Sequence, residues 1–245
     1  MRALIVAALL VAAPAAGQRQ ADPLWVLLQA PDRLDQDRED DKTRNPLELL
    51  RFLGIKPGWK TAELGAGGGY TTELLARAVG PKGKVYSTNN QFVRDKFPDV
   101  VKFWEKRLER PVMKNSVGLA REFDDPLPPE AKGLDLVVIA FLYHDTVWFG
   151  TDRARMNKAI FAALKPGGLY VILDHAGRDG TGVTEVKTLH RIEEKAVVDE
   201  ITAAGFKLAK RGDFLRNPED PRDGNVFGPI RGKTDRFVLA FTKPR

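Results

Sequence analysis

Short apolar runs alternate with amphipathic stretches from about residue 60 to the end of the chain. The apolar runs predict strands, and apolar residues at helical spacing predict helices between them. Runs 134–140 and 168–174 are apolar on both faces, as in central strands of a parallel sheet that helices cover on each side. The expected strands are 60–65, 84–89, 116–123 (the weakest), 134–140 and 168–174, and the expected helices are 71–79, 94–109, 152–164 and 188–204.

The last part of the chain departs from this alternation. The runs "GFKLAKR" (205–211) and "DRFVLAFTK" (235–243) predict two strands with no helix between them. The long connection, 212–234, permits the final strand to run antiparallel, and a loop of this length is more often a binding element than spare chain. We therefore predict an α/β, doubly wound fold with a mostly parallel seven-stranded sheet and an antiparallel last strand.

Three segments are expected along the chain. In residues 1–17, Arg2 precedes an apolar run, 3–13, that is shorter than the roughly 20 residues that span a bilayer. A cleavable signal peptide therefore fits better than a membrane anchor, with a buried N-terminal helix as the alternative. This predicts an exported protein, periplasmic or secreted. Residues 18–45 predict a polar arm that faces solvent rather than a site, and 46–245 the globular domain.

Composition narrows the choice of partners. The chain has 245 residues and a formal charge of +6, but its basic residues are interspersed with acidic ones rather than gathered into runs. This pattern indicates a solvated basic surface and disfavours nucleic-acid binding. The chain has no cysteine, which excludes disulfides and thiolate metal sites.

A glycine loop follows the first expected strand. In "AELGAGGGYTTELLARA" (62–78), glycines occupy positions 65 and 67–69. The dinucleotide fingerprint G-x-G-x-x-G fails here, because its last position falls on Tyr70 or Thr72. The pattern acidic-x-G-x-G-x-G fits, starting at Glu63. A purely structural turn is the alternative.

The loop and several later stretches resemble the class I S-adenosylmethionine-dependent methyltransferases. The stretches are "GPKGKVYSTN" (80–89), "GLDLVVIA" (133–140) and "ALKPGGLYVILD" (163–174), so the resemblance covers about 46–242. The most similar group is a bacterial family of predicted methyltransferases with export signals. Its members resemble this chain in "DRARMNKAIFAALKPGG" (152–168) and "DFLRNPEDPRD" (213–223).

The resemblance implies S-adenosylmethionine as cofactor and suggests residues that bind it. Glu63 would orient the amino-acid end of the cofactor. Asn89 stands where the family usually offers a carboxylate to the ribose, and it lacks that charge. Glu122 and Phe123 would meet the adenine. The residues implied in cofactor binding are Glu63, Gly65, Gly67, Gly69, Tyr70, Asn89, Glu122 and Phe123.

Two histidines just past strand ends are candidate catalytic residues. Methyl transfer from a sulfonium is an in-line displacement, so positioning supplies much of the catalysis, and a base is needed only if the acceptor must lose a proton. His144 with Asp145 predicts such a base, and a histidine bonded to backbone is the even alternative. His175 has a weaker case, because it can simply cap its loop with Asp174.

His190 is expected to be structural. A metal site of the catechol-methyltransferase type is not expected either, since of its three positions, Ala140, Asp174 and His175, only Asp174 matches.

The sequence therefore predicts an exported methyltransferase that acts on a small molecule or an exposed side chain. Two alternatives stay open. One is an exported binding module that keeps the fold without turnover, which Asn89 and the export signal both favour. The other is a nicotinamide oxidoreductase, which the failed fingerprint disfavours.

Overall fold

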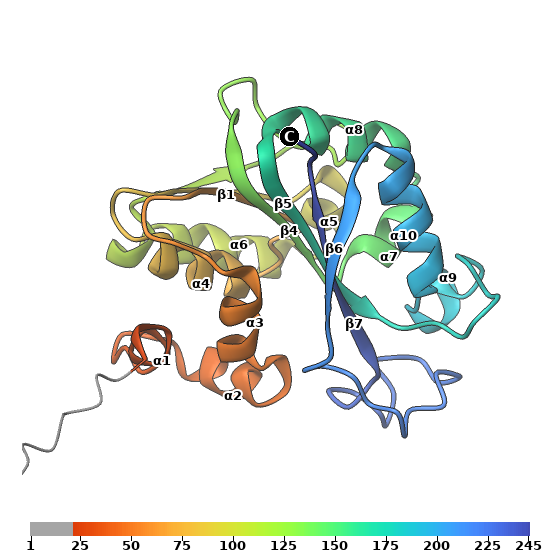
Figure 1. Cartoon of the computed structure of the whole chain (residues 1–245). Coiled ribbons are helices and arrows are strands. Elements are labelled where there is room, and N and C mark those ends of the chain that lie inside the picture. Colours follow the sequence, from red (N-terminus) through yellow and green to blue (C-terminus); the bar gives the residue numbers. More distant parts are fainter. Residues whose placement is uncertain (1–21) are drawn as a thin grey trace, which may run out of the picture.

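A seven-stranded sheet forms the centre of the protein (Figure 1). The computed structural model describes residues 22–245. The spatial order of the strands is β3-β2-β1-β4-β5-β7-β6, and only β7 runs antiparallel to its neighbours. The predicted fold class is thus confirmed. The strands are β1 Lys60–Leu64, β2 Lys84–Thr88, β3 Ser116–Leu119, β4 Leu134–Ala140, β5 Leu164–His175, β6 Lys207–Gly212 and β7 Arg236–Thr242.

Helices cover both faces of the sheet. They are α1 Pro23–Leu28, α2 Asp35–Arg44, α3 Pro46–Leu53, α4 Tyr70–Val79, α5 Gln91–Lys96, α6 Pro98–Leu108, α7 Tyr143–Trp148, α8 Arg153–Ala163, α9 Val186–Leu189 and α10 Glu194–Ala203, with a 3-10 turn at Pro111–Met113. Alternate residues of β4 enter different cores, Leu136 and Val138 on one face and Val137 and Ile139 on the other. Both faces are buried, as the all-apolar strand predicts.

Two expected helices are each divided in the structure. The helix expected over 94–109 breaks at Phe97, because the proline that follows disfavours helical backbone there and instead begins α6. The helix expected over 188–204 breaks at His190, whose backbone is left-handed with φ of 54°. These breaks place α5 and the segment 190–193 near the carboxyl ends of the strands rather than inside long helices.

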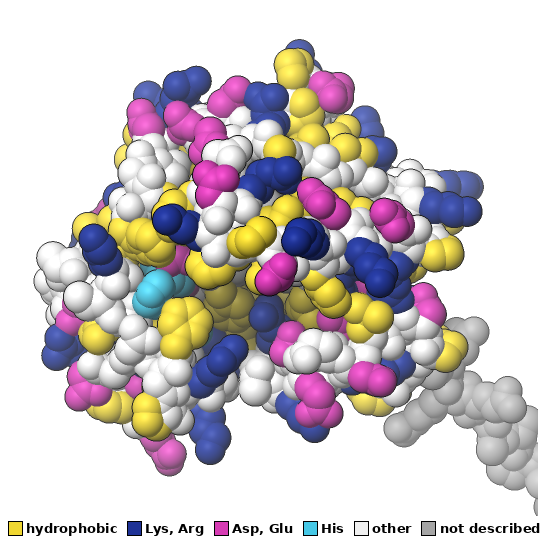
Figure 2. All heavy atoms as spheres, turned by 180° about the vertical axis from the view of Figure 1, so that it is seen from behind, with side chains coloured by type: hydrophobic (Ala, Val, Ile, Leu, Met, Phe, Trp, Pro, Cys, Tyr) yellow, Lys and Arg dark blue, Asp and Glu magenta, His cyan; other side chains and the backbone are white. Residues whose placement is uncertain are grey.

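The carboxyl ends of β1, β4 and β5 meet at one edge of the sheet. Ligands bind beyond this edge in doubly wound folds, near the point where the strand order reverses. The surface is hollowed there, between apolar and basic side chains (Figure 2), and the basic residues that line the hollow are arginines. The loop 213–235, between β6 and β7, and helix α2 lie on two sides of this hollow.

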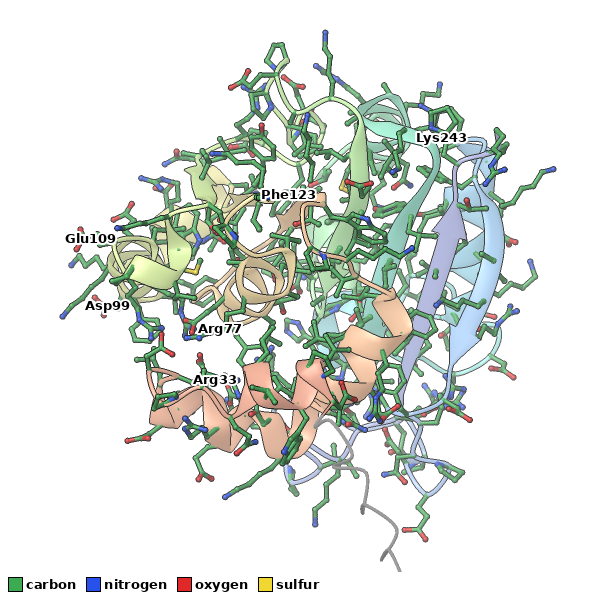
Figure 3. All side chains as sticks on the ribbon, turned by 60° about the vertical axis from the view of Figure 1, so that its left-hand side comes forward. Arg33, Arg77, Asp99, Glu109, Phe123 and Lys243 are labelled. Atoms are coloured by element: carbon green, nitrogen blue, oxygen red, sulfur yellow. The ribbon has the colours of Figure 1, made fainter. Side chains whose placement is uncertain are left out.

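The described part of the N-terminal arm, 22–45, packs one side against the domain, whereas the sequence predicted that it would face solvent. It is mostly helical, and Arg33 and Asp37 are buried. Asp37 in α2 forms a two-pronged ion pair with Arg107 of α6, at 2.6 and 2.8 Å, and Arg107 also donates to Glu73 of α4 at 2.9 Å. Figure 3 shows Arg77 of α4 on the side of that helix that faces the arm. Ion pairs therefore hold the arm against the domain.

The predicted signal peptide, 1–17, lies outside the described residues. Within residues 22–245, none of the helices has the length and apolarity that crossing a membrane requires.

Candidate functional site

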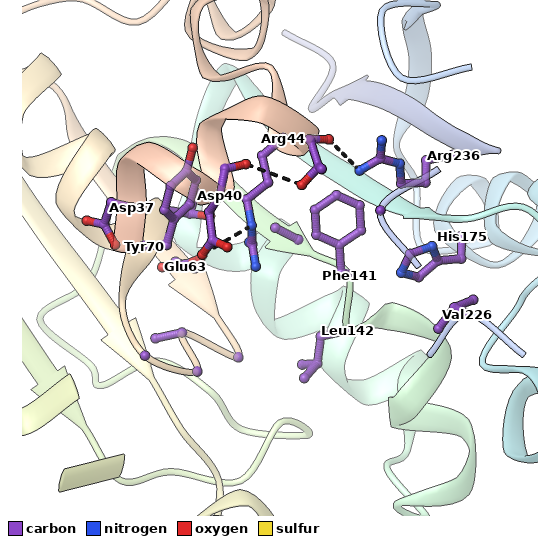
Figure 4. A pocket seen from close by; sticks show the side chains of 18 of the residues that line it. Asp37, Asp40, Arg44, Glu63, Tyr70, Phe141, Leu142, His175, Val226 and Arg236 are labelled. Carbon is purple, nitrogen blue, oxygen red and sulfur yellow. Dashed lines mark hydrogen bonds and ion pairs between the residues drawn. The ribbon is translucent and has the colours of Figure 1, made fainter. Parts of the chain in front are cut away.

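A cavity of about 450 Å³ lies at the carboxyl edge of the sheet. Its volume falls within the range typical of small-molecule sites, about 300–1,000 Å³. Its walls come from α2, the glycine loop after β1, the start of α7, the end of β5 and the loop 213–235 (Figure 4). Segments from distant parts of the sequence therefore converge on one space.

The glycine loop forms one wall, and its backbone requires glycine at position 65. Gly65 has a φ of 74°, and a Cβ added there would lie 2.2 Å from Leu142 Cδ2. The amides of Gly65 and Ala66 both donate to the carbonyl oxygen of Thr88 at the end of β2. The loop is therefore held tightly, with its backbone exposed to the cavity.

Glu63 is buried beside this loop. Its side chain is 2% exposed, and the Thr72 hydroxyl donates a hydrogen bond to its carboxylate. Burial raises the pKa of Glu63 from 4.5 to about 7, and hydrogen bonds from Thr72 and Thr71 and the charge of Arg44 oppose this rise only in part. A cationic group that entered the cavity would find here a carboxylate with no ion-pair partner among the described residues.

Helix α2 contributes charged side chains that the sequence analysis assigned to solvent. The Tyr70 hydroxyl donates to Asp41 at 2.7 Å, and Arg33 holds the same carboxylate at 2.8 Å. The guanidinium of Arg44 lies 4.7 Å from the centre of the Tyr70 ring and lines the cavity. The available signal was the spacing of Asp37, Asp41 and Arg44, which places all three on one side of a helix.

Phe141 lies between two arginines at the cavity wall. The guanidinium carbons of Arg44 and Arg236 each lie 5.7 Å from the centre of its ring. Arg236 is 8% exposed and donates to the carbonyl oxygen of Thr43, while its Nε has no hydrogen-bond partner in the described structure. Arg44 and Arg236 therefore give the cavity positive charge around Phe141. Figure 4 shows Arg236 near His175.

His144 is held between two carboxylates. Its Nδ1 lies 2.7 Å from Asp174 Oδ1, its Nε2 lies 3.0 Å from Asp145 Oδ1, and its backbone amide donates to Asp174 at 2.8 Å. Burial alone would lower the pKa of His144, but Asp174 and Asp145 outweigh it and raise the pKa to about 10. Both ring nitrogens of His144 thus lie beside carboxylate oxygens, and its predicted role as a base stays a prediction.

His175 lies where it could contact an acceptor molecule in the cavity. It lines the cavity, and its Nδ1 lies 2.8 Å from the Thr234 hydroxyl. Burial holds the pKa of His175 well below 6.5, and the positive charges of His144 and Arg236 lower it further. The imidazole is therefore neutral at pH 7, as a base requires. Its catalytic role stays a prediction.

His190 lies in the same cluster, although the sequence analysis treated it as structural. Its Nδ1 is 3.2 Å from Asp145 Oδ1 and 3.3 Å from His144 Nε2. Nothing in the local sequence around 190 points to these neighbours, which lie 45 and 46 positions earlier.

Part of the chain is similar in sequence to curated methyltransferases. No protein-family model matches the chain. It is 27% identical over 124 residues to a protein-L-isoaspartate O-methyltransferase of Pyrococcus horikoshii, covering 51% of this chain and 48% of that protein. It is 26% identical over 121 residues to a ubiquinone/menaquinone biosynthesis C-methyltransferase of Pasteurella multocida, covering 49% and 41%. The match thus spans about half or less of these curated relatives.

Solved structures decide the fold. A SAM-dependent methyltransferase from Aquifex aeolicus superposes with a TM-score of 0.60 at 19% identity, over 86% of this chain and all of the other (100%). The chain has the class I methyltransferase fold. Fibrillarin from Aeropyrum pernix, solved with natively bound S-adenosyl-L-methionine, matches with a TM-score of 0.51 at 14% identity, over 80% of this chain and 74% of that one.

Within this methyltransferase fold, the predicted residues divide into two groups. Those that line the cavity are Glu63, Gly65, Gly67, Tyr70, His144, Asp145 and His175. Those that do not are Gly69, Asn89, Glu122 and Phe123. Gly69 instead precedes α4 as its left-handed cap. The cavity therefore brings together Glu63, Gly65, Gly67 and Tyr70 with the two histidines, and it does not include the residues predicted at the adenine.

The residues predicted at the ribose and adenine have other partners. Asn89 accepts from the Gly67 amide at 3.0 Å and donates to the Gly67 carbonyl oxygen at 3.1 Å, so it clamps the glycine loop. Glu122 accepts from the Gln91 amide at 3.1 Å. Phe123 is 1% exposed and stacks on Phe149, with ring centres 6.4 Å apart. None of the three residues is among those that line the cavity, and their roles at the ribose and adenine stay predictions.

Proposed function

We propose that the protein transfers a methyl group from S-adenosylmethionine to a small molecule or an exposed side chain. The observation that carries this proposal is the buried carboxylate of Glu63 next to a glycine loop with no room for a side chain at Gly65. Curated relatives with methyltransferase names and a neighbouring structure with the cofactor bound support it.

The residues present fit the amino-acid end of the cofactor. Glu63 would accept hydrogen bonds from its ammonium group, since an ionised carboxylate is the strongest partner for such a donor. Gly65 and Gly67 would let the backbone approach closely. Arg44, at the cavity wall, would pair with the carboxylate end. When bound, the cofactor supplies an electrophilic methyl group on a sulfonium.

The chain's own contribution to transfer is mainly to position the acceptor. His175 would accept a proton from an acceptor hydroxyl or amine, because its imidazole is neutral and lines the cavity. Helix α2 and the loop 213–235 both contribute side chains to the cavity wall, where an acceptor would lie.

A labelled-methyl assay tests the proposal. S-adenosylmethionine with an isotopic methyl group is incubated with the protein and panels of hydroxyl, amine and carboxylate acceptors, including an isoaspartyl peptide. We expect label in one acceptor class, with His175→Ala lowering kcat far more than cofactor affinity. Cofactor binding without label in any acceptor would favour the binding module without turnover.

We also propose that residues 1–17 direct export. Support comes from the sequence pattern alone, a cationic residue followed by a short apolar run and small residues. Fusion of residues 1–25 to a reporter that is active only outside the cytoplasm tests this directly. Activity of the reporter is expected, and it should disappear when a charge interrupts the run 3–13.

A further inference from the structure

Three metal-ligating atoms converge at the start of α7. His144 Nε2 and Asp145 Oδ1 lie 3.0 Å apart, Asp145 Oδ1 and His190 Nδ1 lie 3.2 Å apart, and the two histidine nitrogens lie 3.3 Å apart. Ligands of a tetrahedral zinc ion with bonds of about 2.0–2.1 Å are separated by about 3.3 Å. We infer that His144, Asp145 and His190 form a binding site for a divalent transition-metal ion of the zinc class.

Asp174, which contacts Nδ1 of His144, leaves Nε2 of the same ring as the ligand atom. Nδ1 lies 2.7 Å from Asp174 Oδ1, so a neutral ring carries its proton on Nδ1 and directs the lone pair of Nε2 toward Asp145 and His190. A carboxylate that accepts from the far nitrogen of a metal-bound histidine is the usual outer-shell arrangement. Asp174 is fully buried and also accepts from two backbone amides, so it is fixed in place.

The contacts of neighbouring residues hold His190 in an unfavourable backbone conformation. Its φ of 54° costs a non-glycine residue about 1–2 kcal/mol. The residues that follow it hold it there. Ile192 pairs with Ala176 just past β5, and the buried guanidinium of Arg191 binds Asp220 at 2.9 Å. A strained backbone that its surroundings maintain is a common feature of functional sites.

Asp145 completes the set from the first turn of α7. Its Oδ1 also accepts from the Trp148 indole at 2.8 Å, which orients the carboxylate toward the two histidines. The Asp145 and His190 side chains are 17% and 21% exposed, so an ion can enter from solvent. Two histidines and one carboxylate suit zinc, iron or cobalt better than magnesium or calcium, which prefer oxygen ligands.

The site borders the cavity, since His144 and Asp145 line it. Three protein ligands leave at least one coordination position open, as in catalytic zinc sites. An ion held there would bind an acceptor oxygen and lower the pKa of its hydroxyl. That last consequence rests on the proposed methyl transfer, whereas metal binding itself does not.

Metal titration without S-adenosylmethionine tests the inference separately from the proposed function. The full chain is treated with a chelator, dialysed and titrated with Zn²⁺ by calorimetry, and with Co²⁺ by visible absorption. We expect one equivalent of each ion and the absorption bands of Co²⁺ with nitrogen and oxygen ligands.

Matched variants locate the ion. In His190→Asn the new asparagine can adopt the left-handed backbone, and Asp145→Asn keeps the shape of the side chain without its charge. Each should weaken Zn²⁺ binding by more than about 100-fold, beyond the 10–100-fold typical of losing an outer-shell partner. His175→Ala removes the other cavity histidine and should leave the affinity unchanged. Circular dichroism confirms that each variant folds.

Absence of stoichiometric binding to the wild type would overturn the inference. Equal affinity in His190→Asn and the wild type would overturn it as well, and would mean that the cluster is a network of hydrogen bonds only. Either result leaves the proposed methyl transfer untouched, because that proposal is measured with the methyl donor and no added metal.

Discussion

Glu63→Gln probes the buried carboxylate that carries the proposed function. Glutamine has nearly the shape of a protonated glutamic acid but cannot ionise. In the folded protein, burial raises the pKa of Glu63 from 4.5 to about 7. At about 1.36 kcal/mol per pKa unit, this difference corresponds to about 3 kcal/mol.

The sign follows from the direction of the change. Because the pKa is higher in the folded state, the protonated group stabilises the fold fully below pH 4.5, and this contribution is lost as the pH rises through about 7. Glu63→Gln should therefore match the wild type near pH 4.5 and exceed it by about 3 kcal/mol above pH 8. The same variant should bind S-adenosylmethionine more weakly, since it lacks the charge that would pair with the ammonium group.

Urea unfolding between pH 4.5 and 8.5, followed by circular dichroism, measures the difference. Glu219→Gln, at an exposed position of the loop 213–235, serves as the matched control and should show no pH-dependent gain. If the difference between Glu63→Gln and the wild type stays constant across this range, ionising Glu63 does not destabilise the fold and the predicted rise in its pKa is wrong.

Two further substitutions test the loop and the arm. Gly65→Ala should lower the free energy of unfolding by about 2–4 kcal/mol in urea titrations, because its Cβ would clash with Leu142 at a positive φ. Gly67→Ala, which has open space and only the strained φ of 52°, should cost about 1–2 kcal/mol. Asp37→Ala should cost about 3 kcal/mol in the same assay, because it leaves the buried Arg107 with Glu73 as its remaining acidic partner.

An exposed ion pair serves as the control for the buried pair of Asp37 and Arg107. Lys195 and Asp199 form an exposed pair on α10 at 2.5 Å, so Asp199→Ala should leave the stability almost unchanged. Equal losses from Asp37→Ala and Asp199→Ala would contradict the view that α2 is held by a buried ion pair.

The order of strands and helices was predictable because it depends on local periodicity. The run 134–140, apolar on both faces, predicted a central strand, and the absence of a helix between the last two runs permitted an antiparallel pair, as the structure has them. Pro98 was a signal for a helix boundary at Phe97, but the stretch 94–109 was predicted as one helix. The reason is that its amphipathic pattern continues on both sides of the proline.

The site was predictable where it depends on the strand ends. Glu63 and the glycines follow β1, so any doubly wound sheet places them at the carboxyl edge. The partner of Asn89 was not predictable, because its contact with Gly67 joins two loops that are close only in the folded chain. The same holds for Asp37, whose charge suggested solvent and whose partner Arg107 lies 70 residues away.

His190 shows the limit most clearly. Its neighbours are set by the turn after α9 and by the buried pairing of Arg191 with Asp220, which no periodic pattern encodes. A lone histidine in a helix-like stretch therefore indicated a structural role, whereas the fold places it against His144 and Asp145.

Calorimetric titration with S-adenosylmethionine, S-adenosylhomocysteine and NAD measures whether the protein binds the methyl donor. We predict saturable one-site binding of both sulfur ligands, no binding of NAD, and a large loss of affinity in Gly65→Ala. Absence of binding of either sulfur ligand at millimolar concentration, with the protein folded by circular dichroism, would contradict this prediction.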